Sequence, residues 1–185
     1  MKEVSALNNI GRFVIPSVVS SHFHIRNGDT VADIGAGSGY FLETLSNLVG
    51  PEGKLYAVDV QRSLVEAMGD LARTKNLNNV EVIWGDCDEA NGSKIPTDVA
   101  DVAILVNTLF QFEKKDDALE ELKRILRPGG KLFIIDWLES FSGLGPQPDQ
   151  VVTATTAKDL ATNAGFTFDR DFDAGDHHYG LAFRL

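Results

Sequence analysis

The chain has one cysteine, no long apolar run and few basic residues among its 185 positions. The single cysteine, Cys87, excludes an intramolecular disulfide and any metal site made only of thiolates. No stretch approaches the roughly 20 apolar residues that a membrane span requires. The N-terminal residues 1–16 include Glu3 and two asparagines and have no long apolar core, so we expect no signal peptide. These absences predict a cytoplasmic protein with no membrane partner.

Acidic residues outnumber basic ones, with 27 Asp and Glu against 17 Lys and Arg and a net charge of −10. Because nucleic-acid phosphates are bound chiefly by Lys and Arg, this balance predicts no nucleic-acid partner. The four histidines, His22, His24, His177 and His178, lack the spacing typical of a zinc site. We therefore predict no bound metal.

The length suits a single domain, which we take to be residues 1–185. Residues 1–28 precede the first apolar run and include Phe13 and Phe23, whose spacing suits a helix after Pro16. We predict an N-terminal helical segment that packs on the core.

Short apolar runs alternate with helical patterns in the middle of the chain. They are rich in Val, Ile and Leu and show little alternation, as expected of strands covered on both faces. The predicted strands are Thr30–Ile34, Lys54–Asp59, Val80–Trp84, Val99–Val106 and Lys131–Asp136. Repeated strand–helix units predict an α/β fold with a doubly wound parallel sheet.

Three helices are predicted between these strands from apolar residues spaced three or four apart. We expect the third to have Asp116 as its cap and to stop at Pro128-Gly129-Gly130. The apolar positions are Phe41, Leu45 and Leu48 in the first helix, Leu64, Met68 and Leu71 in the second, and Leu119, Leu122 and Ile125 in the third.

The C-terminal part has a different pattern. A helix is predicted over Thr156–Ala164, with Thr156 as the cap of a T-x-x-D signal. Two segments of alternating apolar residues, 166–172 and 179–185, then flank a turn at Gly175-Asp176. This pattern predicts an antiparallel hairpin that closes the edge of the sheet.

The stretch VADIGAGSGYF, residues 31–41, has the pattern of a buried strand, a glycine-rich turn and the start of a helix. A dinucleotide-binding turn has the pattern G-x-G-x-x-G, whereas here Gly39 comes one residue early and Tyr40 takes the sixth position. Asp33 would also oppose a pyrophosphate at the helix N-terminus. The turn therefore disfavours a nicotinamide-dependent oxidoreductase, which we keep as an alternative, and suits a ligand with positive charge.

Carboxylates also follow the next two predicted strands. Asp59 can accept hydrogen bonds from both hydroxyls of a ribose. Asp86 can accept the exocyclic amino proton of adenine, or alternatively cap its own loop. Because ligands of such sheets bind outside the carboxyl ends of the strands, three carboxylates there suit an adenosine with a cationic tail. S-adenosylmethionine has this chemistry, and we predict it as the cofactor.

At this point the chain resembles the class I S-adenosylmethionine-dependent methyltransferases, over nearly its whole length. The motifs that carry the resemblance are VADIGAGSGYF (31–41), LYAVDV (55–60), WGDCDE (84–89), DVADVAILVNTLFQF (98–112) and LRPGGKLFIIDW (126–137). It looks most similar to small methyltransferase-domain proteins akin to the ubiquinone/menaquinone C-methyltransferases. The resemblance implies a Rossmann-like methyltransferase fold of seven strands with an antiparallel last strand. It also implies a lid over the acceptor as the alternative role of residues 1–28.

The resemblance and the residues together predict the site. The cofactor-binding residues are expected to be Asp33, Gly35, Ala36, Gly37, Gly39, Tyr40, Asp59, Val60, Asp86, Cys87 and Asn107. A general base is needed only if the acceptor must lose a proton, and the candidates are His178 and Asp136. Asp136 has a local capping role as its alternative.

These observations predict an enzyme that transfers a methyl group from S-adenosylmethionine to a small-molecule acceptor. A module that binds the cofactor without catalysis is the other alternative, because its cofactor motifs would look the same.

Overall fold

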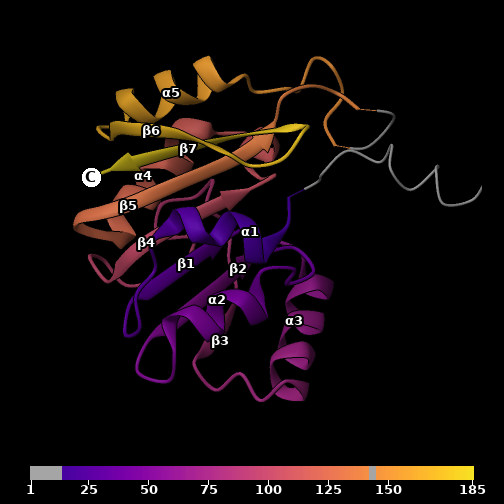
Figure 1. Ribbon diagram of the computed structural model, residues 1–185, viewed down its shortest axis with the longest axis vertical. Helices are drawn as coiled ribbons and strands as arrows, with labels where there is room; N and C mark the ends of the chain where they lie inside the picture. Colours follow the sequence, from indigo (N-terminus) through magenta and orange to yellow (C-terminus); the bar gives the residue numbers. More distant parts are fainter. Residues whose placement is uncertain (1–13, 142–144) are drawn as a thin grey trace, which may run out of the picture.

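The computed structural model describes residues 14–141 and 145–185, which form a seven-stranded sheet in the order β3-β2-β1-β4-β5-β7-β6 (Figure 1). The strands are β1 (Thr30–Ile34), β2 (Lys54–Asp59), β3 (Val80–Trp84), β4 (Ala100–Val106), β5 (Leu126–Trp137), β6 (Thr167–Asp173) and β7 (His178–Arg184). The first five strands pair in parallel, whereas β7 pairs antiparallel with both β5 and β6. The predicted doubly wound α/β sheet with an antiparallel last strand is confirmed.

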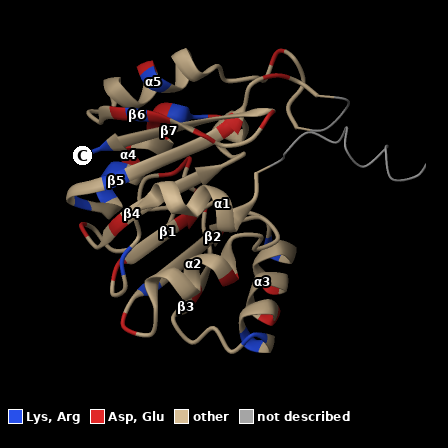
Figure 2. Cartoon of the chain, viewed as in Figure 1, with Lys and Arg blue, Asp and Glu red and all other residues tan. Residues whose placement is uncertain are grey.

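Helices cover both faces of the sheet (Figure 1). They are α1 (Pro16–Val19), α2 (Leu42–Val49), α3 (Arg62–Thr74), α4 (Lys115–Ile125) and α5 (Ala154–Asn163), with short 3₁₀ turns η2 (Ser20–Phe23) and η3 (Leu109–Gln111). One core cluster includes Phe23, Leu42 and Met68 and lies beneath α1, α2 and α3. The other includes Leu119 and Ala157 and lies beneath α4 and α5. Acidic and basic residues are interspersed over the helices and loops (Figure 2).

The predicted bounds of β1, β2 and β3 are confirmed, but β5 begins earlier than predicted. Leu126 already pairs with Ala100, and a register shift separates this pair from the rest of the ladder. Gly130 accepts a hydrogen bond from the backbone N–H of Leu185 at 3.0 Å. The predicted Pro128-Gly129-Gly130 stop therefore lies within the extended segment.

The predicted helix caps are wrong in two places. The helix α5 is capped by Thr153, whose Oγ1 accepts the N–H of Thr156 at 3.2 Å, so Thr156 lies within the helix. The helix α4 has Lys114 at its N-cap and no side-chain cap. Asp116 instead lies in the first turn, where its negative charge favours the positive end of the helix dipole. Leu48, one of the apolar positions from which the first helix was predicted, is 37% exposed.

The N-terminal segment forms only short helical turns within its described part. Val19 and Phe23 are buried there, whereas Ile15 and Val18 are 45% and 55% exposed. Phe13 and the rest of residues 1–13 lie outside the described residues. Whether the segment acts as a lid stays a prediction, as does the assignment of residues 1–185 to a single domain.

Candidate functional site

The glycine-rich turn after β1 is shaped by close packing. Gly35, Gly37 and Gly39 all have positive φ, at 72°, 58° and 80°. A Cβ on Gly35 would lie 2.4 Å from the Thr108 methyl carbon, so no larger residue fits there without movement. A Cβ on Gly37 would meet only the Gly35 carbonyl, at 4.0 Å, which leaves this backbone open.

Asp59 holds the turn from the end of β2. It is 7% exposed, its Oδ2 accepts the N–H of Gly37 at 2.9 Å, and its Oδ1 accepts the N–H of Gln61 at 2.8 Å. Each carboxylate oxygen has a second lone pair, so both can accept a further hydrogen bond. Asp59 can therefore shape the turn and still bind a pair of ligand hydroxyls.

Asp33 is buried near Asp59, with 3% of its surface exposed. Burial raises the pKa of the Asp33 carboxyl from 3.8 to about 7, and the charge of Asp59 adds to the effect. A positively charged group near these two carboxylates would favour the ionised form of Asp33. This electrostatic environment suits a cationic ligand and disfavours a pyrophosphate.

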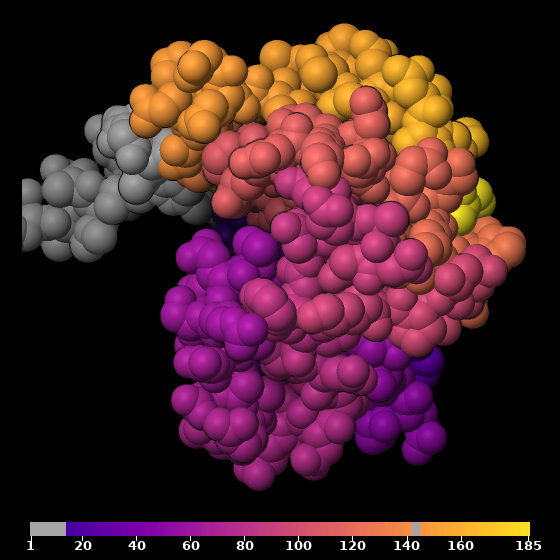
Figure 3. All heavy atoms as spheres, turned by 180° about the vertical axis from the view of Figure 1, so that it is seen from behind, coloured from indigo at the N-terminus to yellow at the C-terminus, as the bar shows by residue number. Residues whose placement is uncertain are grey.

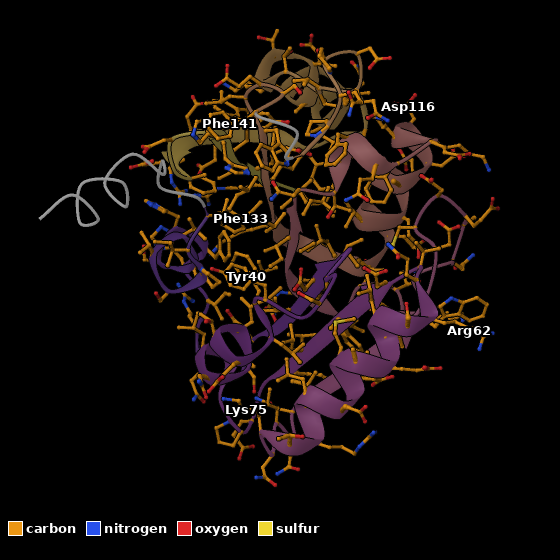
Figure 4. All side chains as sticks on the ribbon, turned by 90° about the vertical axis from the view of Figure 1, so that its right-hand side faces the viewer. Tyr40, Arg62, Lys75, Asp116, Phe133 and Phe141 are labelled. Atoms are coloured by element: carbon orange, nitrogen blue, oxygen red, sulfur yellow. The ribbon has the colours of Figure 1, made fainter. Side chains whose placement is uncertain are left out.

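A cleft of about 210 Å³ lies at the carboxyl ends of the strands. Figure 4 faces this side of the molecule, where the labelled Tyr40 side chain projects near the start of α2. Six of the predicted cofactor residues line the cleft: Gly35, Gly37, Asp59, Val60, Asp86 and Cys87. The other five do not line it: Asp33 lies in β1, Ala36, Gly39 and Tyr40 lie on the turn that follows β1, and Asn107 directly follows β4.

The segment after β3 contributes Asp86 and Cys87. Asp86 is exposed, and its Oδ1 accepts the N–H of Asp88 at 3.0 Å. This bond is the local capping that the sequence left open, and it leaves the second carboxylate oxygen available. Burial raises the pKa of the Cys87 thiol to about 12, so this thiol stays protonated at neutral pH.

Asn107 directly follows β4 and is hydrogen-bonded to β5. It has a left-handed backbone with φ of 57°, and its N–H donates to the Ile135 carbonyl at 2.8 Å. Its carbonyl accepts the Gln111 side-chain amide at 2.7 Å. Within the described part of the chain, its side-chain oxygen is buried without a hydrogen-bond partner. Asn107 therefore positions the adjoining segment, with one acceptor atom to spare.

Asp136 is buried at the end of β5, with 1% of its surface exposed. Its carboxylate accepts the N–H groups of Phe110 at 3.1 Å and Trp137 at 2.8 Å. Burial is the largest influence and raises its pKa to about 6, against the opposing effect of these bonds. Tyr179 lies opposite it in the ladder, with a buried hydroxyl that has no hydrogen-bond partner among the described residues.

His178 lies opposite Trp137 in the same ladder, with ring centroids 4.3 Å apart. Successive residues of a strand point to opposite faces, so His178 and Asp136 lie on different faces of the sheet. Burial lowers the pKa of His178 to about 4, with a smaller effect from His177. The imidazole is therefore neutral at physiological pH and a weak proton acceptor.

Residues 25–170 match the family model described as a methyltransferase domain. The chain belongs to this methyltransferase family. The predicted membership of the S-adenosylmethionine-dependent methyltransferases is confirmed, and S-adenosylmethionine is the cofactor of the family.

Curated relatives of this methyltransferase include ubiquinone/menaquinone biosynthesis C-methyltransferases named UbiE. The protein from Pseudomonas paraeruginosa is 28% identical over 121 residues, which are 65% of this chain and 46% of the relative. The protein from Hahella chejuensis is 31% identical over 114 residues, or 61% of this chain and 45% of the relative. The chain thus spans less than half the length of these relatives.

Solved structures share the fold. A S-adenosylmethionine-dependent methyltransferase from Aquifex aeolicus has a TM-score of 0.86 and 29% identity, covering 99% of this chain and 97% of that one. The [4+2]-cyclase SpnF has a TM-score of 0.72 and 20% identity, covering 86% of this chain and 59% of that one. At this lower identity the second likeness concerns the fold alone.

The cleft fits the cofactor of the family. Open backbone at Gly37 and acceptor oxygens on Asp59 and Asp86 match an adenosine, and the acidic pair of Asp33 and Asp59 matches its cationic part. The predicted cofactor site did not include Gln61, Leu64, Thr108 and Gln111, which also line the cleft. These residues follow β2 and β4 in the chain. Their position after the carboxyl end of a parallel strand is the one feature of the sequence that could have indicated a place in the cleft.

Residues 14–141 and 145–185 contain no helix long and apolar enough to cross a membrane. The same two ranges contain no group of three or more His, Cys, Asp or Glu residues that could hold a metal ion. The sequence predictions on metal, membrane, nucleic acid and cellular location stay predictions.

Proposed function

We propose that the protein transfers the methyl group of S-adenosylmethionine to a small-molecule acceptor. One observation supports this more than any other: Asp59 and Asp86 line the same cleft as the open backbone of Gly37, and Asp33 is buried beside it. A ligand that presents ribose hydroxyls, an adenine amino group and a positive charge would use all three carboxylates.

Each carboxylate then has a distinct part in binding. Asp59 accepts hydrogen bonds from the ribose hydroxyls, and Asp86 accepts one from the adenine amino group. Asp33 receives the positive charge of the methionine end. S-adenosylmethionine supplies an electrophilic methyl group on a good leaving group, so the protein mainly aligns the acceptor and excludes water.

An acceptor that must lose a proton needs a base, and we assign this part to Asp136 ahead of His178. A base works best when its pKa lies near the working pH, and the pKa of Asp136 is raised to about 6. The pKa of His178 is lowered to about 4, which makes it a weaker base. Asp136 also contacts the backbone of Phe110, beside the cleft-lining Gln111.

The acceptor class to test first is an electron-rich aromatic ring. The curated relatives are named as ubiquinone/menaquinone biosynthesis C-methyltransferases. Methylation at a ring carbon releases a proton that a carboxylate can take. Phenols, thiols and amines form the comparison set.

Binding and turnover assays separate the alternatives. A bound ligand at about 100 times its dissociation constant stabilises a protein by roughly 2.7 kcal/mol, which thermal unfolding detects readily. We expect stabilisation by S-adenosylhomocysteine and none by NAD; the reverse result would favour an oxidoreductase. Release of S-adenosylhomocysteine is then followed with each acceptor class. Binding without release on any acceptor would favour a module that holds the cofactor without catalysis.

A further inference from the structure

The end of the cleft that would hold the adenine has two walls, and the residues that form them are far apart in the sequence. Gly85, Asp86 and Cys87, after β3, line one side, and Gln111 and Phe112, after β4, line the other. The chain segments that carry these walls adjoin on the face shown in Figure 3. An adenine that binds between the two walls would contact both of them only if the distance between the walls were fixed.

Asp88 joins the two segments through a single carboxylate. Its Oδ2 accepts the N–H of Glu113 at 2.9 Å, and its Oδ1 accepts the N–H of Lys114 at 3.2 Å. Its own N–H donates to Oδ1 of Asp86 at 3.0 Å. The residue thus orients the Asp86 carboxylate on one wall and holds the chain that directly follows Phe112 on the other.

The β3–β4 loop has a cleft-side limb, residues 85–88, and an opposite limb, residues 91–95. The opposite limb is held by α4. Glu121 of α4 is 3% exposed and accepts the N–H groups of Asn91 at 3.0 Å and Ser93 at 3.1 Å. Arg124 donates to the Ile95 carbonyl at 2.8 Å. The cleft-side limb is joined to this one by the N–H of Asp86, which donates to the Gly92 carbonyl at 3.0 Å. The Asp88 side chain then ties the cleft-side limb to the start of the same helix.

The neighbouring ion pair contributes little to this connection. Lys114 Nζ lies 2.9 Å from Glu89 Oε1, but the two side chains are 52% and 67% exposed. Such surface pairs are weak because water and salt screen them. The two N–H groups that Asp88 accepts belong to the backbone, so this tie avoids the entropy cost of holding two long exposed side chains in place and is the stronger one.

We propose that Asp88 is a positioning residue for the adenine end of the cofactor site, which sets the spacing between the Asp86–Cys87 wall and the Gln111–Phe112 wall. This inference rests on the proposed function, because it takes the ligand of the cleft to be an adenosine. Asp88 does not line the cleft and acts through Asp86 and through the segment after Phe112.

The Asp88→Asn variant tests the inference. Glu113 and Lys114 donate to different carboxylate oxygens, and in a carboxamide held in the same orientation the NH₂ group replaces one of them and faces an N–H donor. We expect calorimetry to show a roughly five- to thirtyfold loss of affinity for S-adenosylhomocysteine. The same factor is expected for 5′-methylthioadenosine, which keeps the adenosine and lacks the amino-acid end.

Two variants serve as controls. Asp116→Asn removes a nearby charge from the exposed first turn of α4 and should leave both affinities unchanged; its side chain lies on the outside of the molecule (Figure 4). Asp33→Asn should weaken the binding of S-adenosylhomocysteine and leave the binding of 5′-methylthioadenosine unchanged, in contrast to the equal losses expected for Asp88→Asn.

Three results would overturn the inference. They are unchanged affinities in a folded Asp88→Asn protein, a loss confined to S-adenosylhomocysteine, and an equal loss in Asp116→Asn. If Asp88→Asn does not fold, Asp88→Glu displaces the carboxylate by one methylene and is judged by the same criteria. Failure of the unaltered protein to bind either ligand would instead contradict the proposed function.

Discussion

Replacing Asp33 by Asn should make the protein more stable at alkaline pH while weakening its hold on the cofactor. Asp33 is buried, and its pKa rises from 3.8 to about 7 on folding. The folded state therefore favours the protonated carboxyl. Its contribution to stability is full below pH 4 and is lost as the pH rises toward 7, because the unfolded chain ionises first.

The size of the effect follows from the pKa. At 1.36 kcal/mol per pKa unit, a rise from 3.8 to about 7 corresponds to about 4 kcal/mol. This is a ceiling, because the buried carboxamide has its own desolvation cost. We expect the gain in the free energy of unfolding to be close to zero at pH 4 and about 2 kcal/mol at pH 8.

Urea unfolding at both pH values measures the difference directly, since a change in midpoint at constant slope reports stability. Asp116→Asn, an exposed substitution, is the control for loss of one negative charge. A stability difference between Asp33→Asn and the unaltered protein that does not vary with pH would refute the reasoning. So would an Asn variant that binds S-adenosylhomocysteine as tightly as the unaltered protein.

The remaining predictions concern three parts of the site. Asp59→Ala removes the acceptor for the ribose hydroxyls and should cost at least tenfold in S-adenosylhomocysteine affinity by calorimetry, whereas unchanged affinity would place the ribose elsewhere. Asp136→Asn should lower kcat about a hundredfold with cofactor affinity retained, and His178→Ala should stay within a few-fold, whereas the reverse order would make His178 the base. With Asp136 as base, kcat/KM of the unaltered enzyme should rise as the pH increases through about 6. Gly35→Ala should destabilise the fold by about 2–4 kcal/mol in urea unfolding, because its Cβ would strike Thr108 and its φ is positive; a neutral effect would show that the turn relaxes.

The parallel part of the sheet was predictable because each strand is a short apolar run that ends in a distinctive residue. Asp59, for example, marks the end of β2, and the strand has the predicted bounds. The cap of α5 was not predictable in the same way. Thr153 and Thr156 both suit a cap, and only the geometry shows that Thr153 accepts the bond.

The cofactor site likewise has residues that the sequence predicts and residues that only the structure reveals. Residues on the glycine turn were predictable because the chemistry of the ligand demands bare backbone and carboxylates in a fixed order. Thr108 and Gln111 were not, because they approach the cleft only after the chain crosses from β4 into η3. Asp88 belongs to the WGDCDE motif, but nothing in that motif shows that its side chain reaches Glu113.

The position of β7 has a consequence for how the protein reaches its folded state. β6 is joined to the sheet through β7, although β6 comes first in the chain. During synthesis β6 therefore has no pairing partner until residues 178–184 have emerged, and it joins the sheet only when β7 pairs with β5. Until then the apolar β5 is an open edge, which is the kind of surface that invites association between chains. The antiparallel ladder of β5, β7 and β6 is thus a late, non-local step of assembly that protects as well as completes the sheet.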